Sequence, residues 1–297
     1  MSDMSDIHKP VLLNEIVELL CPQSGKQFID ATINGGGHTR ALLSQMKGKG
    51  GVLGIDLDCD LIERLRQEQR ANLSLVCGNY ADITMHAKKH GIGVVDGVIA
   101  DLGFSSYHID ASGRGFSFLR DEPLDMRYSP QSNEVTATRI VNEWSENDIS
   151  HLVAHYGEER FAARIARAIV RARGREAITR STQLAEIIKN AVPGFVRRGR
   201  IHPATRTFQA LRIEVNREFE NLERFLAAAP RLLARNGVLA IITFHSIEDR
   251  MVKQKFRAYT KEGDFELLTK KPISSSYDEI HNNPRARSAK MRAIKLK

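Results

Sequence analysis

Short apolar runs alternate with amphipathic stretches over the first third of the chain. The apolar runs have the length of buried strands, and the stretches between them carry apolar residues at steps of three and four, as amphipathic helices do. The predicted strands are residues 27–30, 51–56, 73–77 and 94–101. Apolar strands separated by helices predict an α/β fold with a parallel sheet.

This alternation stops in the middle of the chain and returns near its end. Residues 111–202 begin with a loop rich in glycine and proline and continue as amphipathic helices. Further strands are predicted at residues 237–244, 265–269 and 290–296. We therefore predict an α/β domain formed by residues 1–110 and 203–297, interrupted by an all-helical domain at 111–202 that holds the substrate.

Composition narrows the class of partner and the compartment. The 297 residues are 42% hydrophobic and carry a net charge of +8, which favours a polyanionic partner. Cys21, Cys59 and Cys77 form no C-x-x-C pair, a spacing that argues against a zinc site and for a reducing compartment. Neither a signal peptide nor a membrane span is visible, so we expect a cytoplasmic protein with no membrane partner and no metal.

The turn after the first predicted strand carries the first candidate chemistry. The strand ends at Asp30, and the glycines follow late and consecutively as Gly35, Gly36 and Gly37, before a helix. A dinucleotide site needs G-x-G-x-x-G directly after the strand, to place a pyrophosphate at the helix N-terminus. A carboxylate at this point repels a pyrophosphate but suits S-adenosylmethionine, which carries an ammonium and a sulfonium.

Two further strands also end on a carboxylate. Asp56 follows the second strand, where such folds hydrogen-bond a ribose diol, and Asp58 is better placed to cap the next helix. Asp101 ends the fourth strand. Because ligands bind outside the carboxyl ends of parallel strands, Asp30, Asp56 and Asp101 are expected to meet at one crevice.

Several other residues have two interpretations each. Tyr80 either stacks on an adenine ring or packs on a neighbouring helix, and His245 either contacts substrate or caps the turn in which it lies. Four arginines at helical spacing form either a solvated face or a phosphate-binding face: Arg160, Arg164, Arg167 and Arg171. Ser105 and Ser106 lack a G-x-S-x-G elbow, which disfavours a hydrolase.

Several short sequence motifs are specific when taken together, although each motif alone is weak. They are Gly36-Gly37-His38, Asp101-Leu102-Gly103 with Ser105-Ser106, Arg114-Gly115-Phe116-Ser117-Phe118, Pro123-Leu124-Asp125-Met126-Arg127, Tyr156-Gly157-Glu158-Glu159-Arg160-Phe161, residues 202–209, Phe244-His245-Ser246 with Glu248-Asp249-Arg250, and residues 283–288. With these stretches the chain resembles, nearly end to end, the ribosomal RNA small-subunit methyltransferase H family, also called MraW.

This resemblance implies a Rossmann-like class I methyltransferase that uses S-adenosylmethionine. It further implies methylation of N4 of a cytidine in the decoding (P-site) region of 16S rRNA, within the small ribosomal subunit. The family's cofactor contacts fall on Gly36, Gly37, His38, Asp56, Tyr80, Asp101 and His108. Tyr80 stands where phenylalanine is usual, and Tyr107-His108 where proline and glutamine are common.

Asp101 is the candidate catalytic residue, because it is placed to orient both cofactor and amine. The aromatic candidates for binding the unstacked base are Phe104, Tyr107 and Phe116. The remaining substrate candidates are Ser105, Ser106, Arg127, His202, Arg206, His245, Arg285 and Arg287. A DNA amino-methyltransferase, a nicotinamide oxidoreductase and a non-catalytic RNA-binding assembly factor are the alternative functions, and the sequence is compatible with a monomer or a homodimer.

Overall fold

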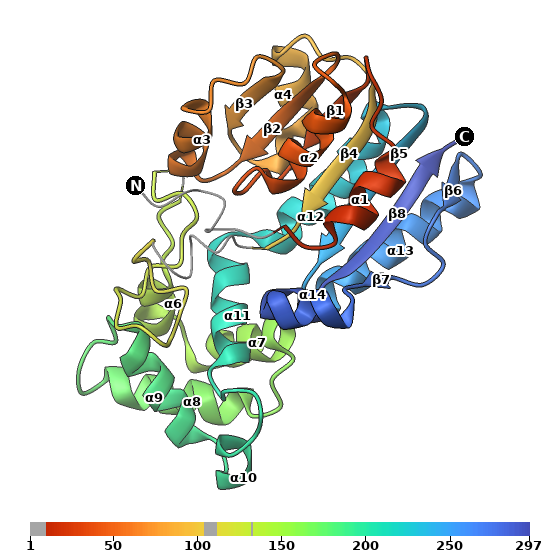
Figure 1. The fold of residues 1–297 in the computed structure, drawn as a ribbon. Coiled ribbons are helices and arrows are strands. Elements are labelled where there is room, and N and C mark those ends of the chain that lie inside the picture. The colour runs from red at the N-terminus through yellow and green to blue at the C-terminus, as the bar shows by residue number, and fades with distance from the viewer. Residues whose placement is uncertain (1–9, 104–111, 132) are drawn as a thin grey trace. The chain divides into compact units, whose positions relative to one another are not determined.

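A computed structural model describes residues 10–103, 112–131 and 133–297, and the chain forms two compact units (Figure 1). The first unit joins residues 1–105 to residues 219–297, and the second is formed by residues 106–218. No helix among the described residues is both long and apolar enough to cross a membrane.

The first unit is built on one mixed sheet. Its strands are β1 (Gln27–Asp30), β2 (Gly51–Asp56), β3 (Leu73–Cys77), β4 (Val95–Asp101), β5 (Leu233–Thr243), β6 (Phe265–Leu267), β7 (Ile273–Ser274) and β8 (Lys290–Leu296). They lie in the order β3-β2-β1-β4-β5-β8-β6, with β7 also paired to β8. Strands β1 to β5 are parallel, and β8 is antiparallel to its neighbours. The predicted α/β fold is therefore confirmed.

Alternate residues of the strands enter two cores, one on each face of the sheet. Ile29 and Val98 pack with apolar residues of helices α4, α12 and α13, whereas Phe28 and Ile99 pack with helices α1 and α2. This alternation follows from the two-residue period of a strand and requires helices on both faces. The helices of this unit are α1 (Leu13–Leu20), α2 (Gly37–Gln45), α3 (Cys59–Arg66), α4 (Ile83–Lys89), α12 (Glu218–Ala228), α13 (Ser246–Glu262) and α14 (Tyr277–Asn282).

The second unit has its own hydrophobic core. Its helices are α6 (Ala137–Glu143), α7 (Glu146–Gly157), α8 (Ala162–Arg173), α9 (Ser181–Ala191), α10 (Gly194–Arg197) and α11 (Thr205–Val215). Phe208 and Leu211 of α11 are buried in this core together with Leu152 of α7. The expected return to the α/β domain at residue 203 thus differs from the structure, because α11 buries its apolar face in the helical unit.

Three short 3₁₀ helices complete the described elements. The 3₁₀ helices are η2 (Tyr80–Asp82), η3 (Ala229–Leu232) and η4 (Pro284–Ser288).

A polar network holds a loop of the helical unit in place. Both carboxylate oxygens of Glu218 accept hydrogen bonds from the buried Arg212 guanidinium, at 2.8 and 2.9 Å. The Tyr128 hydroxyl donates to the same carboxylate at 2.9 Å, so the loop that precedes α6 is tied to the end of α11.

Two of the cysteines are joined. A disulfide links Cys59, the first residue of α3, to Cys77, the last residue of β3, and Cys21 is free and exposed. The spacing of the cysteines gave no sign of a pair, whereas the structure joins two of them across 18 residues of sequence. The sequence could not reveal this disulfide, because it depends on β2 and β3 pairing so that Cys77 lies opposite Asp56.

Thiol labelling tests this pairing. We expect iodoacetamide to add one group to the denatured, unreduced protein, at Cys21, and three groups after reduction, as counted by intact-mass spectrometry. Peptide mapping should then locate the two additional groups on Cys59 and Cys77. Three groups added without reduction would show that the pair is reduced in the isolated protein.

Candidate functional site

Three carboxylates lie at the same edge of the sheet, as the sequence predicted. Asp30 is paired in register with Gly54 of β2 and Ile99 of β4, so it lies two positions before both Asp56 and Asp101 along those strands. These strands are parallel, so all three side chains lie at their carboxyl ends. The expected convergence on one edge is confirmed.

Asp30 is almost fully buried, with 1% of its surface exposed. The Thr39 hydroxyl donates a hydrogen bond to Oδ2 at 2.7 Å. Burial raises the pKa of Asp30 to about 6, although the nearby His38 and the Thr39 hydrogen bond oppose that rise, and the charge of Asp101 adds to it. A buried carboxylate of this kind is stabilised by a positive charge beside it.

Asp101 is held from two sides. Its backbone N–H donates to the Thr32 hydroxyl at 2.6 Å, which fixes the end of β4 against the residues that follow β1. Its Oδ2 lies 4.0 Å from Nδ1 of His38. The His38 ring is fixed in turn, because its Nε2 is 2.9 Å from the carbonyl oxygen of Val11, which can only accept a hydrogen bond. His38 therefore turns its other ring nitrogen toward Asp101.

The turn between β1 and α2 requires glycine at two positions. Gly36 caps α2 with φ of +76°, a left-handed conformation that favours glycine. A Cβ atom on Gly37 would come within 2.8 Å of the Pro10 ring, so a side chain does not fit there without a shift. The left-handed conformation thus accounts for the glycine at position 36, and packing against Pro10 accounts for the one at position 37.

Asp58 has the capping role predicted for it, and Asp56 binds backbone groups. Asp58 caps α3 by accepting a hydrogen bond from Asp60 N–H at 3.0 Å. The Asp56 carboxylate accepts from Asn34 N–H and from Asp58 N–H, each at 2.9 Å. Asp56 therefore holds the backbone on both sides of it, at Asn34 before α2 and at Asp58 before α3.

Tyr80 follows β3 and begins the 3₁₀ helix η2. Its ring meets Phe225 of α12 edge to face, with the ring centroids 5.3 Å apart. Of its two interpretations, packing on a neighbouring helix is therefore observed, and contact with adenine stays a prediction.

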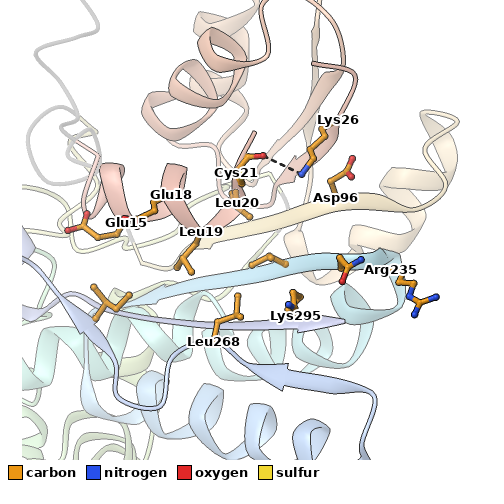
Figure 2. A pocket seen from close by; sticks show the side chains of 13 residues that line it. Glu15, Glu18, Leu19, Leu20, Cys21, Lys26, Asp96, Arg235, Leu268 and Lys295 are labelled. Carbon is orange, nitrogen blue, oxygen red and sulfur yellow. Dashed lines mark hydrogen bonds between the residues drawn. The ribbon is translucent and has the colours of Figure 1, made fainter. Parts of the chain in front are cut away.

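A cavity of about 520 Å³ lies at the opposite end of the sheet and is not this site (Figure 2). Lys26 directly precedes β1, and Asp96 lies at the start of β4, so this cavity opens at the amino ends of those strands. Figure 2 also shows Lys26 donating to the carbonyl oxygen of Cys21, at 3.3 Å. Its lining mixes acidic, basic and aliphatic side chains, and it contains none of the three converging carboxylates.

Comparison with known proteins decides what kind of site the carboxyl edge carries. The model of the MraW methylase family matches residues 5–297. The chain belongs to the MraW methylase family. The ribosomal RNA small subunit methyltransferase H of Deinococcus radiodurans is 49% identical over 286 residues, which cover 96% of this chain and 88% of that protein. The protein of the same name from Symbiobacterium thermophilum is 42% identical over 306 residues, covering 97% and 96%.

A weak likeness to a solved structure is also found. A putative rRNA-methylase from Clostridium thermocellum is 10% identical, with a TM-score of 0.40 over 97% of this chain and 98% of that chain. A likeness this low indicates nothing about function.

As a MraW methylase the chain is a methyltransferase with a Rossmann-like fold, and S-adenosylmethionine is its cofactor. The residues present fit that molecule. The buried Asp30 and Asp101 carboxylates suit the positive charges of S-adenosylmethionine. Gly36 has no side chain, so a ligand can approach the backbone closely there. Asp56 lies at the same edge of the sheet, and its contact with the ribose stays a prediction.

Within the helical unit, two predicted substrate residues have structural roles. Phe116 is buried in the core and stacks on Tyr128 at 5.4 Å, so little of its ring is accessible to a base. The Arg127 guanidinium donates to both oxygens of Asp125 and to the Asn133 carbonyl oxygen. This pairing raises the pKa of Arg127, and the side chain organises its own loop.

His202 and Arg206 lie near the start of α11. The His202 ring stacks on Phe118 at 4.5 Å, and its Nδ1 accepts from Ala204 N–H at 3.2 Å. Partial burial, reinforced by the charge of Lys189, lowers the pKa of His202. The Arg206 guanidinium donates to the Glu158 carbonyl oxygen at 3.0 Å and remains half-exposed. Their contact with substrate stays a prediction.

In the first unit, His245 caps α13, which is one of its two interpretations. Its Nδ1 accepts from Glu248 N–H at 3.4 Å, and its Nε2 lies 3.1 Å from Oε1 of the same buried residue. Arg285 and Arg287 lie on the 3₁₀ helix η4, and Arg287 is exposed. The candidates Phe104, Ser105, Ser106, Tyr107 and His108 lie outside the described residues.

Sequence analysis missed the two hydroxyls that organise the carboxylates. Thr39 bonds the Asp30 side chain, and Thr32 bonds the Asp101 backbone. A weak signal was present, because both threonines follow closely after the first acid, Thr32 in the turn and Thr39 in the first turn of α2. Only the path of that turn shows which groups they reach.

Proposed function

We propose that the protein transfers a methyl group from S-adenosylmethionine to N4 of a cytidine in the decoding region of 16S rRNA, within the small ribosomal subunit. The observation that carries this proposal is the buried cluster of Asp30, His38 and Asp101 at the carboxyl edge of the sheet, in a chain of the MraW methylase family. Relatives named ribosomal RNA small subunit methyltransferase H, nearly full length, support rRNA as the substrate.

The chemistry explains why a buried carboxylate is needed. The amino nitrogen of cytosine is a weak nucleophile, because its lone pair is delocalised into the ring. S-adenosylmethionine supplies an activated methyl group when bound. The protein must hold the amine in line with that methyl group, and positioning of this kind supplies much of the rate. Asp101 accepts a hydrogen bond from the amine and stabilises the positive charge that develops there.

The supporting residues keep Asp101 ready for this role. Thr32 fixes its backbone, and His38 faces its Oδ2, so the carboxylate does not need to reorganise when the amine arrives. The catalytic turn Asn/Asp-Pro-Pro-aromatic, found in amino-methyltransferases of DNA, is replaced here by Leu102-Gly103-Phe104. This difference disfavours duplex DNA as the substrate.

The helical unit is assigned to substrate recognition. Its separate core allows it to present a surface that does not take part in cofactor binding. The net charge of +8 suits a polyanionic partner, and this unit contains the exposed arginines of α8.

Mass spectrometry of 16S rRNA tests the proposal. Fragments from a strain lacking the gene should lack one methyl group on a cytidine of the decoding region, and the purified protein should restore it on isolated small subunits. Parallel reactions with duplex DNA should give no product. Methylation of DNA, or binding of small subunits without transfer of label from methyl-tritiated cofactor, would favour one of the alternative functions.

A further inference from the structure

An exposed aromatic ring stands out on the helical unit. Phe195 of α10 is 62% exposed, which is unusual for so large an apolar side chain. Its ring centroid lies 6.3 Å from that of Phe161, at an angle of 66°. The Arg160 guanidinium lies over both rings, 4.6 Å from the Phe161 centroid and 5.3 Å from that of Phe195. These cation–π contacts favour this arrangement of the exposed ring.

Two further arginines lie near this pair of rings along the chain. Arg164 is exposed in the first turn of α8, four residues after Arg160, which precedes the helix. A terminal guanidinium nitrogen of Arg198 is 3.9 Å from where a Cβ of Gly194 would lie, so this side chain folds back toward the start of α10, the helix that carries Phe195. Among the residues that the structure describes, neither Arg164 nor Arg198 forms an ion pair with a carboxylate. We call Arg160, Arg164, Phe195 and Arg198 the arginine–phenylalanine surface.

Neighbouring arginines show what a structural role looks like in the same unit. Arg197 donates to the carbonyl oxygens of Val192 and Asn190, at the end of α9. Arg173 donates to those of Val141 and Trp144. Arginines that complete the fold are thus bonded to backbone oxygens, whereas those around Phe195 are left facing solvent.

We infer that the arginine–phenylalanine surface binds a single-stranded segment of rRNA, with an unpaired base stacked on Phe195 and the flanking phosphates on Arg164 and Arg198. The combination of an exposed aromatic ring and guanidinium groups without carboxylate partners suits single-stranded nucleic acids, because each nucleotide offers both a flat base and a charged phosphate. An acidic protein surface would use the charges but not the ring. This inference rests on the proposed function for the identity of the RNA.

The experiment separates stacking from phosphate contact. Dissociation constants for small subunits from the deletion strain, and for a fluorescent oligocytidine, are measured over a range of salt concentrations for the full-length protein. Phe195→Ala should weaken binding of both about tenfold, within the range for loss of one stacked base, without changing the salt dependence. Arg198→Gln should instead reduce the slope of log Kd against log salt by about 0.7, as for one lost phosphate contact on a single strand.

Matched variants control for folding and for general loss of surface groups. Phe195→Trp keeps a stacking ring and should bind like the wild type. Leu119→Ala removes an apolar side chain of the same unit that is 82% exposed, and Arg139→Gln removes a charge that pairs with Glu143. Both should leave the two dissociation constants and the salt slope unchanged. Cofactor affinity should be the same in every variant.

The possible failures are distinguishable. Unchanged binding by Phe195→Ala, while the wild type methylates small subunits, would overturn this inference and leave the proposed function standing. A wild type that transfers no methyl group to small subunits would overturn the proposed function, and the oligocytidine measurement would still show whether the surface holds single strands. Loss of self-association in Phe195→Ala, seen by sedimentation velocity with RNA binding unchanged, would assign the surface to a second copy of the chain and overturn the inference.

Discussion

Asp101→Ala is expected to lower the rate of methyl transfer at saturating cofactor and substrate by about a hundredfold to a thousandfold, the range for removing one preorganised electrostatic partner of a transition state. The reason is the position of this side chain, which is buried at the carboxyl end of β4 and faces His38. The measurement is single-turnover transfer of labelled methyl groups to small subunits, with the cofactor dissociation constant determined separately by calorimetry.

This pair of measurements distinguishes two roles for Asp101. A residue that orients the amine and stabilises its charge is needed in the transition state, so its loss lowers the maximal rate. A residue that only holds the cofactor would raise the dissociation constant, and excess cofactor would then restore the rate. Full recovery of this kind would contradict the catalytic role. Asp96→Asn is the matched control, since Asp96 lies on the same strand but at its other end, where it accepts a hydrogen bond from Gln27 N–H.

The position of the three carboxylates could be predicted because it depends only on a local pattern. Each acid ends an apolar run, and parallel strands bring such ends to one edge whatever the loops do. The hydroxyls of Thr32 and Thr39 could not be assigned in this way, because their partners depend on the path of the turn between β1 and α2.

Residues of the helical unit were harder to predict for the same physical reason. The apolar spacing of α11 indicates a buried face, but not which of two cores buries it. Phe116 and Arg127 are residue types suited to RNA binding, yet one fills the core and the other is bonded within its own loop. Residue type alone does not separate a binding side chain from one that completes the fold.

Cofactor affinity is expected to depend on pH through Asp30. Burial raises the pKa of this carboxyl to about 6, while Thr39 and His38 favour its charged form and Asp101 disfavours it. A cationic ligand binds the ionised carboxylate better, so affinity should rise as the pH increases through about 6 and level off above it. At pH 5 only about a tenth of the groups are ionised, and the dissociation constant should be about tenfold higher than on the plateau.

The stability of the free protein should change with pH in the opposite direction. The folded pKa of Asp30, about 6, lies above the ordinary value of 3.8, so the native state binds more protons than the unfolded state between these values. The free energy of unfolding contributed by this group therefore falls as the pH rises from about 4 to about 6. The full shift of the pKa corresponds to about 3 kcal/mol. By this amount the contribution of Asp30 to the free energy of unfolding is lower above pH 6 than below pH 4.

Asp30→Asn removes the titrating group and tests both effects together. We expect this variant to bind S-adenosylmethionine more weakly than the wild type at pH 8, because the negative charge is gone, and to lose the rise in affinity around pH 6. Its free energy of unfolding should exceed that of the wild type at pH 8, because no buried charge remains uncompensated. Asp96→Asn should keep the wild-type dependence in both calorimetry and urea titration. A variant that still shows the rise around pH 6 would place the titrating group elsewhere and remove Asp30 from the cofactor site.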